Sequence, residues 1–150
     1  MTSSTLVTAS ETGESPFTVR IQMGDFWLTG DEPVSQGGGE LGPSPFQLMS
    51  AALAECTAMT VRWYGRQQGW PLDHVEVTVG HSRTRVEGTG VELFEKTVWI
   101  TGDKLSEEQK ARLLSVAGKC PVQRALEGAA RITSRAGPAP QRVQTATAQG

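Results

Sequence analysis

Two cysteines, Cys56 and Cys120, are the residues of this chain best suited to redox chemistry. Two thiols are too few for a disulfide scaffold in a chain of 150 residues, so the sequence favours free thiols in a reducing compartment. A redox role needs a lowered thiol pKa, access for a substrate, and a partner that resolves the oxidised sulfur. Cys120 can resolve Cys56 only if the fold brings their Cα atoms within about 4.4 to 6.8 Å. Alternatively, Cys56 is a small residue that fits a crowded helix, since free cysteine is commonly buried.

The local sequence around the two thiols differs. Cys120 directly precedes Pro121 at the predicted start of a short helix, where free N–H groups favour a thiolate. Cys56 lies in the middle of a long predicted helix, so a cation from elsewhere must lower its pKa. Arg62 lies about 600° further around that helix and points away from Cys56. Glu55 would raise the thiol pKa if it lay close to the sulfur.

Other chemistries lack their signatures in this sequence. There is no phosphate-binding loop, no dinucleotide fingerprint and no nucleophile-elbow serine. His74 and His81 are too few for a usual zinc site and are interpreted as structural or surface residues, so no metal or other cofactor is expected. The formal net charge of -2 indicates neither nucleic-acid nor membrane-surface binding. With no long apolar run and no signal-peptide pattern, a cytoplasmic protein is expected.

The helix that carries Cys56 has clear boundaries in the sequence. Ser44 is the predicted N-cap, Pro45 opens the first turn, and Gln47 completes a capping box. The pattern continues to about Gln68, with Gly69 as the C-cap. The first half of this helix is apolar nearly all round, which is typical of a helix buried on every side. One chain of this size would struggle to cover it, so the sequence predicts a homodimer that packs helix against helix.

The other elements follow from the alternation of apolar and polar residues and from turn residues. The predicted strands span residues 17–23, 26–29, 75–85, 93–101 and 130–134, and the predicted helices span residues 44–68, 106–117 and 121–128. The glycine-rich loop over residues 34–43 is expected to be irregular, so something must order it. Residues 1–15 and 137–150 lack periodicity and are expected to be flexible. The order β-β-α-β-β-α-α-β predicts a single α+β domain over residues 1–150, with an ordered core over about 17–135.

Two segments carry a family resemblance: residues 37–62, with Gly-Pro-Ser-Pro before the helix, and Lys119-Cys-Pro-Val-Gln-Arg-Ala-Leu126. Together they resemble the OsmC/Ohr superfamily, the osmotically inducible protein C and organic hydroperoxide resistance proteins. The resemblance extends over about residues 17–135 and is greatest with the OsmC-like redox-protein branch. It implies an OsmC-like α+β fold, in which two long central helices pack between antiparallel sheets in an intertwined homodimer. The site is then expected at the dimer interface.

The resemblance also implies a thiol peroxidase of peroxiredoxin type, active in oxidative stress defence. In that reaction Cys56, the peroxidatic thiol, attacks a small organic hydroperoxide and becomes a sulfenic acid. Cys120, the resolving thiol, condenses with it to a disulfide, which a cellular dithiol reduces. The alternative on the same fold is a non-enzymatic dimeric module that binds a small ligand or senses the redox state, and a third interpretation is a purely structural dimer.

The chain departs from the family pattern at the residues that activate the thiol. Peroxidase members carry a Glu directly after the proline that opens the helix, and this chain has Phe46 there. They also carry an Arg ahead of the helix that pairs with this Glu, and residues 31–43 contain none. Arg20, on the first predicted hairpin, is the candidate activating cation if the dimer brings it close. Many members of the branch have His after Cys-Pro-Val, whereas this chain has Gln123.

Overall fold

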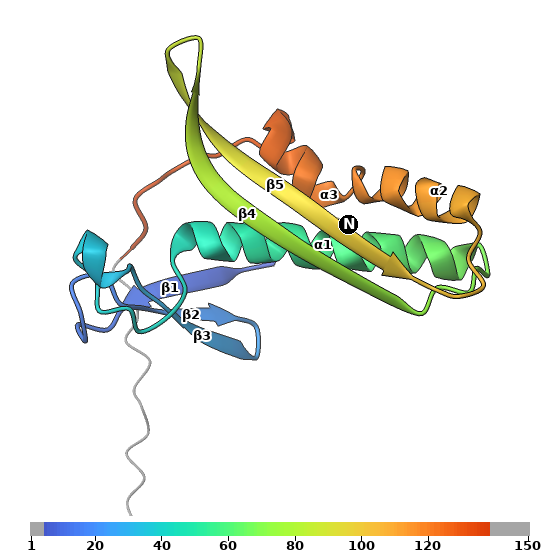
Figure 1. Ribbon diagram of the computed structural model, residues 1–150. Coiled ribbons are helices and arrows are strands. Elements are labelled where there is room, and N and C mark those ends of the chain that lie inside the picture. Colours follow the sequence, from blue (N-terminus) through green and yellow to red (C-terminus); the bar gives the residue numbers. More distant parts are fainter. Residues whose placement is uncertain (1–4, 139–150) are drawn as a thin grey trace, which may run out of the picture.

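The computed structural model describes residues 5–138 and shows an α+β fold with one long helix beside two antiparallel sheets (Figure 1). One sheet has the order β1-β2-β3 and the other is the hairpin β4-β5. The strands are β1 (Val7–Glu11), β2 (Val19–Met23), β3 (Phe26–Gly30), β4 (His74–Val86) and β5 (Thr89–Thr101). The helices are η1 (Val34–Gln36, 3₁₀), α1 (Pro45–Gln67), α2 (Glu107–Ala117), α3 (Pro121–Arg124) and the π-helical turn η2 (Ala125–Ala129). The predicted α+β class with antiparallel sheets is confirmed.

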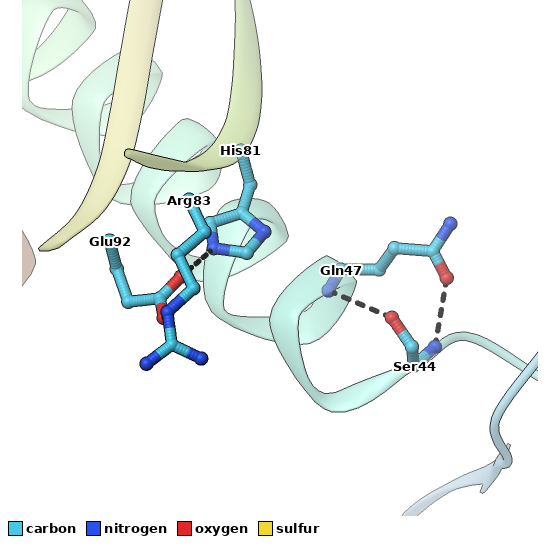
Figure 2. A network of polar contacts seen from close by, with 5 residues as sticks. All are labelled: Ser44, Gln47, His81, Arg83 and Glu92. Carbon is cyan, nitrogen blue, oxygen red and sulfur yellow. Dashed lines mark hydrogen bonds and ion pairs between the residues drawn. The ribbon is translucent and has the colours of Figure 1, made fainter. Parts of the chain in front are cut away.

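Helix α1 begins and ends within one residue of its predicted bounds. The backbone N–H of Gln47 donates to Ser44 Oγ (3.3 Å), and that of Ser44 donates to Gln47 Oε1 (2.8 Å), as Figure 2 shows. This reciprocal pair is the predicted capping box, with Pro45 in the first turn. At the other end, Gly69 takes a positive φ of 65°, which ends the helix. Local sequence signals therefore determine the extent of α1.

The β4-β5 hairpin supplies the surface on which α1 packs. Its two-residue turn has positive φ at both Glu87 (49°) and Gly88 (82°), which suits the right-handed twist of the strands. Every second residue of its basal part faces the helix and is half-buried: Val75, Val77, Val79 and His81 on β4, and Phe94, Lys96, Val98 and Ile100 on β5. Figure 1 shows the hairpin lying along the length of α1. One member of this otherwise largely apolar face is a lysine.

The hydrophobic core lies at the C-terminal half of α1. Its buried members come from α1, α2 and the connections of the hairpin: Val61, Leu72, Leu105, Leu113 and Ala117. The N-terminal half and the outer face of α1 are not covered to the same degree. Met59 and Trp63 are each 61% exposed, and Phe46 is 39% exposed. A single chain therefore leaves a large apolar surface along its central helix.

A buried carboxylate orders the glycine-rich loop before α1. Asp31 is 3% exposed at the end of β3. Burial raises the pKa of this carboxyl, but hydrogen bonds outweigh the effect and hold its pKa below the ordinary value. The donors are the backbone N–H groups of Glu32, Gly39 and Leu41 and the hydroxyls of Ser15 and Thr18. The glycine-rich loop over residues 34–43 was expected to need an ordering contact, and the Asp31 carboxylate provides it.

Two predictions about the chain ends are wrong. Residues 7–11, expected to lack regular structure, form β1 and pair with β2. All five side chains are exposed, so no buried face imposed an alternating pattern that would have revealed this strand. Residues 130–134, expected as a last strand, have no regular structure, because no strand edge pairs with them. The prediction for residues 137–150 falls, from residue 139 onward, outside the described residues.

Candidate functional site

The fold brings the two cysteines together. Cys56 lies in the middle of α1, and Cys120 is the N-cap residue of α3, as predicted. Both are free thiols, and they come within 3.7 Å of each other. The contact forms because α3 packs against α1. Two residues far apart in the chain thus form one pair.

Cys120 is the buried member of the pair, with 0% exposure. Its Sγ accepts a hydrogen bond from the backbone N–H of Gln123 (3.3 Å), in the position of a helix N-cap. The hydroxyl of Thr57, one residue after Cys56 on α1, lies 3.5 Å from the same sulfur. Donors therefore approach this sulfur from two elements.

Lys96 extends from β5 to the same place. Its Nζ donates to Thr57 Oγ1 (3.1 Å) and to the carbonyl oxygen of Ala117 (2.7 Å). Within residues 5–138, no carboxylate forms an ion pair with Lys96. The ammonium is therefore held by neutral oxygens next to the thiol pair.

These contacts act on the pKa of the Cys120 thiol. Burial raises the pKa of the thiol, but four effects together hold the pKa below its ordinary value. They are the hydrogen bonds from the Thr57 hydroxyl, the Gln123 backbone and the Cys56 thiol, and the positive charge of Lys96. The predicted contribution of the helix N-terminus is present, and it acts together with a cation that the sequence analysis did not identify. These contacts favour the ionised form of Cys120.

Cys56 is the accessible member. It is half-buried and lines an open, mainly apolar cavity of about 710 Å³ on the outer face of α1. The other lining residues are Ala52, Glu55, Met59, Thr60, Trp63, Lys119, Pro121 and Val122. A small apolar molecule in this cavity would contact Cys56. Cys120 has no exposed surface and lies behind Cys56.

Phe46, at the position where the family resemblance led us to expect a glutamate, belongs to an aromatic cluster. The ring of Phe46 stacks on His81, with centroids 4.3 Å apart. His81 Nε2 lies 2.7 Å from Glu92 Oε2, and Arg83 Nε lies 3.4 Å from the other oxygen of Glu92. Figure 2 shows these three side chains beside the start of α1. A carboxylate thus reaches this region from β5 rather than from the helix.

The arginines considered from the sequence do not contact the thiols within one chain. The guanidinium of Arg20 lies 4.1 Å from the centroid of the Trp27 ring, on the three-stranded sheet. Arg62 donates to the carbonyl oxygens of Leu72 and Asp73, so it points away from Cys56 as expected. Gln123 donates through Nε2 to Glu127, and its buried Oε1 has no partner among the described residues.

Two lysines near the thiols were missed at the sequence level. Lys119 lines the Cys56 cavity, and Lys96 contacts Thr57. A signal for Lys96 was present, since it falls between Phe94 and Val98 on the inward-facing positions of an alternating strand. A lysine at such an inward-facing position is rare unless its positive charge has a partner.

Comparison with known proteins identifies the family. The OsmC-like protein family model matches residues 37–135, so the chain belongs to this family, within the OsmC/Ohr superfamily. The search of curated proteins gave no match.

Three solved structures illustrate the similarity of fold. The organic hydroperoxide resistance protein OsmC of Legionella pneumophila is 23% identical, over 85% of this chain and 92% of the other, with a TM-score of 0.67. An OsmC-like protein of Mycoplasma pneumoniae is 19% identical, over 86% and 91%, with a TM-score of 0.71. The organic hydroperoxide resistance protein OhrB of Bacillus subtilis is 22% identical, over 84% and 92%, with a TM-score of 0.59.

Two further observations concern residues 5–138 only. No helix in this part of the chain combines the length and apolar character that crossing a membrane requires. Clusters of three or more His, Cys, Asp or Glu side chains able to hold a metal ion are also absent from this part.

Proposed function

We propose that this protein reduces small organic hydroperoxides in oxidative stress defence, with Cys56 as the peroxidatic thiol and Cys120 as the resolving thiol. The observation that carries the proposal is the contact between an accessible thiol and a buried thiol with a lowered pKa, 3.7 Å apart. An accessible sulfur can meet the substrate, and a thiolate beside it can complete the disulfide. Organic hydroperoxide resistance is the described role of several proteins that share the fold.

The first step uses the one proton that the pair holds. The Cys56 S–H donates to the Cys120 sulfur, and transfer of this proton leaves a thiolate on Cys56. That thiolate attacks the terminal oxygen of the hydroperoxide, so an S–O bond forms and the O–O bond breaks. The alkoxide that leaves takes the proton from Cys120 and becomes the alcohol. Cys56 is now a sulfenic acid and Cys120 is again a thiolate.

The second step closes the disulfide. Cys120 attacks the sulfur of the Cys56 sulfenic acid, the S–S bond forms, and hydroxide leaves and takes a proton from solvent to become water. A cellular dithiol then attacks the disulfide, is itself oxidised, and returns both cysteines to the reduced state. The net reaction converts one hydroperoxide and one dithiol into one alcohol, one water and one disulfide. No metal or other cofactor takes part.

The apolar character of the Cys56 cavity supports an organic substrate. Met59, Trp63 and Val122 offer surface to a hydrocarbon group, and this burial favours an alkyl or aryl hydroperoxide over hydrogen peroxide. Lys119 is the cation of this chain that lines the cavity. It adds positive charge close to the oxygen atoms on which negative charge develops.

A homodimer is part of the proposal. Met59 and Trp63, on the exposed apolar face of α1, line the cavity together with Cys56, so this face and the cavity are continuous. Surface of this kind is typical of an interface. Packing two copies of α1 between the two kinds of sheet would cover it and give the intertwined arrangement of the family. Arg20 of a second copy is a candidate for an additional cation near Cys56.

We place the protein in the cytoplasm, where dithiols are reduced, without nucleic-acid or membrane partners.

A redox sensor or ligand-binding module on the same fold is the second candidate. It is favoured by Phe46, which stands where the activating glutamate of peroxidase members is expected and stacks on His81. A related structure from Vibrio cholerae, 23% identical over 86% of this chain and 88% of the other, holds a molecule of captopril in one of its active sites; its TM-score is 0.65. A sensor would form the disulfide once per oxidation event without sustained turnover.

The test combines the purified protein with cumene hydroperoxide and dithiothreitol. We expect steady hydroperoxide consumption by the wild type, none above background by Cys56→Ser, and a single turnover by Cys120→Ser, with a sulfenic acid trapped by dimedone. Consumption by the wild type no faster than by Cys56→Ser refutes the enzyme. Disulfide formation without steady consumption supports the sensor instead.

A further inference from the structure

Lys96 is a half-buried cation whose place in the fold is explained neither by packing nor by an ion pair. It lies on the inward face of β5 between Phe94 and Val98, opposite Val79 of β4. Placing an ammonium on a largely apolar face costs free energy unless an anion compensates it. Among residues 5–138 no carboxylate does so. The positive charge of Lys96 contributes to lowering the pKa of the Cys120 thiol, which it approaches through the Thr57 hydroxyl.

The hydrogen bonds of Lys96 orient the hydroxyl between it and the thiol. An ammonium has three donors, and two of them bind Thr57 Oγ1 and the Ala117 carbonyl oxygen. A hydroxyl that accepts from Lys96 must direct its single proton elsewhere. Two acceptors are in place: the Leu53 carbonyl oxygen at 2.7 Å and Cys120 Sγ at 3.5 Å. When Cys120 carries a negative charge, the proton can turn from the carbonyl to the sulfur.

We propose that Lys96 is a positioning residue for the thiol pair, which keeps the negative charge on Cys120 through its own charge and through the Thr57 hydroxyl. The inference rests on the proposed function, because this thiolate is the base and the resolving nucleophile of the proposed reaction. Lys96 then supplies, from a strand, the positive charge that peroxidase relatives are expected to supply with an arginine. Lys96, Thr57 and Cys120 all belong to the same chain.

The other charged groups around the pair lie on several elements. Glu55 on α1 and Lys119 before α3 line the cavity of Cys56. Glu92 on β5 and Glu127 in η2 line, together with Lys96, a second cavity of about 660 Å³. Both glutamates already have partners, since Glu92 pairs with His81 and Arg83 and Glu127 accepts from Gln123. Removing Lys96 is expected to raise the pKa of Cys120, because the Thr57 hydroxyl that it orients and its own positive charge both lower this pKa.

The test measures the thiolate directly. In a Cys56→Ser background, Cys120 is the one remaining thiol, and its ionisation is followed by absorbance at 240 nm against pH. We expect Lys96→Met, which keeps the length and removes the charge, to shift the titration midpoint to higher pH and to lower the thiolate fraction at pH 7. Lys96→Arg should restore a midpoint near that of the Lys96 protein. Lys110→Met, on the exposed face of α2, should leave it unchanged.

Each outcome decides the proposal. An unchanged midpoint in Lys96→Met overturns it, and so does an upward shift that Lys96→Arg fails to reverse, because that result indicates packing rather than charge. If Lys96→Met does not fold, as judged by urea unfolding, Lys96→Gln is titrated in its place under the same criteria. The titration uses no hydroperoxide. A shifted midpoint in a protein without peroxidase turnover refutes the proposed function and leaves the role of Lys96 standing, while turnover with an unchanged midpoint does the reverse.

Discussion

Oxidation is predicted to join Cys56 and Cys120 of one chain in a disulfide that stabilises the fold. The bond would close a loop of 65 residues, from position 56 to position 120. By chain entropy, closing a loop of that length in the unfolded state stabilises the folded state by about 4 kcal/mol at 25 °C. The two cysteines already lie 3.7 Å apart, so a bond of about 2.05 Å requires only a local shift at the start of α3. Strain from this shift subtracts from the gain, and we expect about 2 to 4 kcal/mol in favour of the oxidised protein.

Urea unfolding measures this difference. The reduced protein is treated with one equivalent of cumene hydroperoxide, and mass spectrometry checks that two hydrogens are lost. Unfolding is then followed by tryptophan fluorescence for the reduced and oxidised forms. With a urea dependence of about 2 kcal/mol per molar, the oxidised protein should unfold at a midpoint about 1 to 2 M higher. Cys120→Ser, treated in the same way, should keep the midpoint of its untreated form.

Two results would refute the reasoning. A disulfide that joins two chains, seen as a covalent dimer on a non-reducing gel, would show that the contact between Cys56 and Cys120 within one chain is not the one that reacts. An intrachain disulfide with no gain in stability would show that α3 cannot approach α1 without a loss of packing equal to the entropic gain.

Two further predictions concern the loop and the dimer. Because the pKa of Asp31 is lowered in the folded state, its stabilisation is present above the ordinary carboxyl pKa and lost as pH falls through the lowered value. Asp31→Asn should lower the urea midpoint at pH 7 and weaken its acid dependence, whereas Asp25→Asn, in the β2-β3 turn, should change neither. Trp63→Glu, on the exposed face of α1, should convert a dimer to monomers in analytical ultracentrifugation, and Trp99→Glu, on the outer face of β5, should not. A dimer that survives Trp63→Glu contradicts the proposed interface.

Local signals in the sequence predicted the central helix and the hairpins. Ser44, Pro45 and Gln47 act on each other within one turn, so the start of α1 could be read without any knowledge of the rest of the chain. The same holds for the alternation of β4 and for Cys120 at the start of α3. β1 was not predicted, because an exposed strand has no buried face that imposes an alternating sequence pattern. It forms by pairing with β2, which is a tertiary contact.

The sequence indicated that the two cysteines could meet, but not which charged residues lie around them. Both thiols and the family could be identified from the residues and their order, since these are properties of the chain itself. The helix N-terminus at Cys120 was predicted, but the contributions of Thr57 and Lys96 were decided by tertiary structure, because these residues meet Cys120 only when β5 and α3 pack on α1. Electrostatic energy depends on distance and burial, and neither is encoded in spacing along the chain. The sequence alone thus determined the extent of α1 and the place of Cys56 in it. Tertiary packing determined that Cys120 and Lys96 meet α1 at Thr57, beside that cysteine.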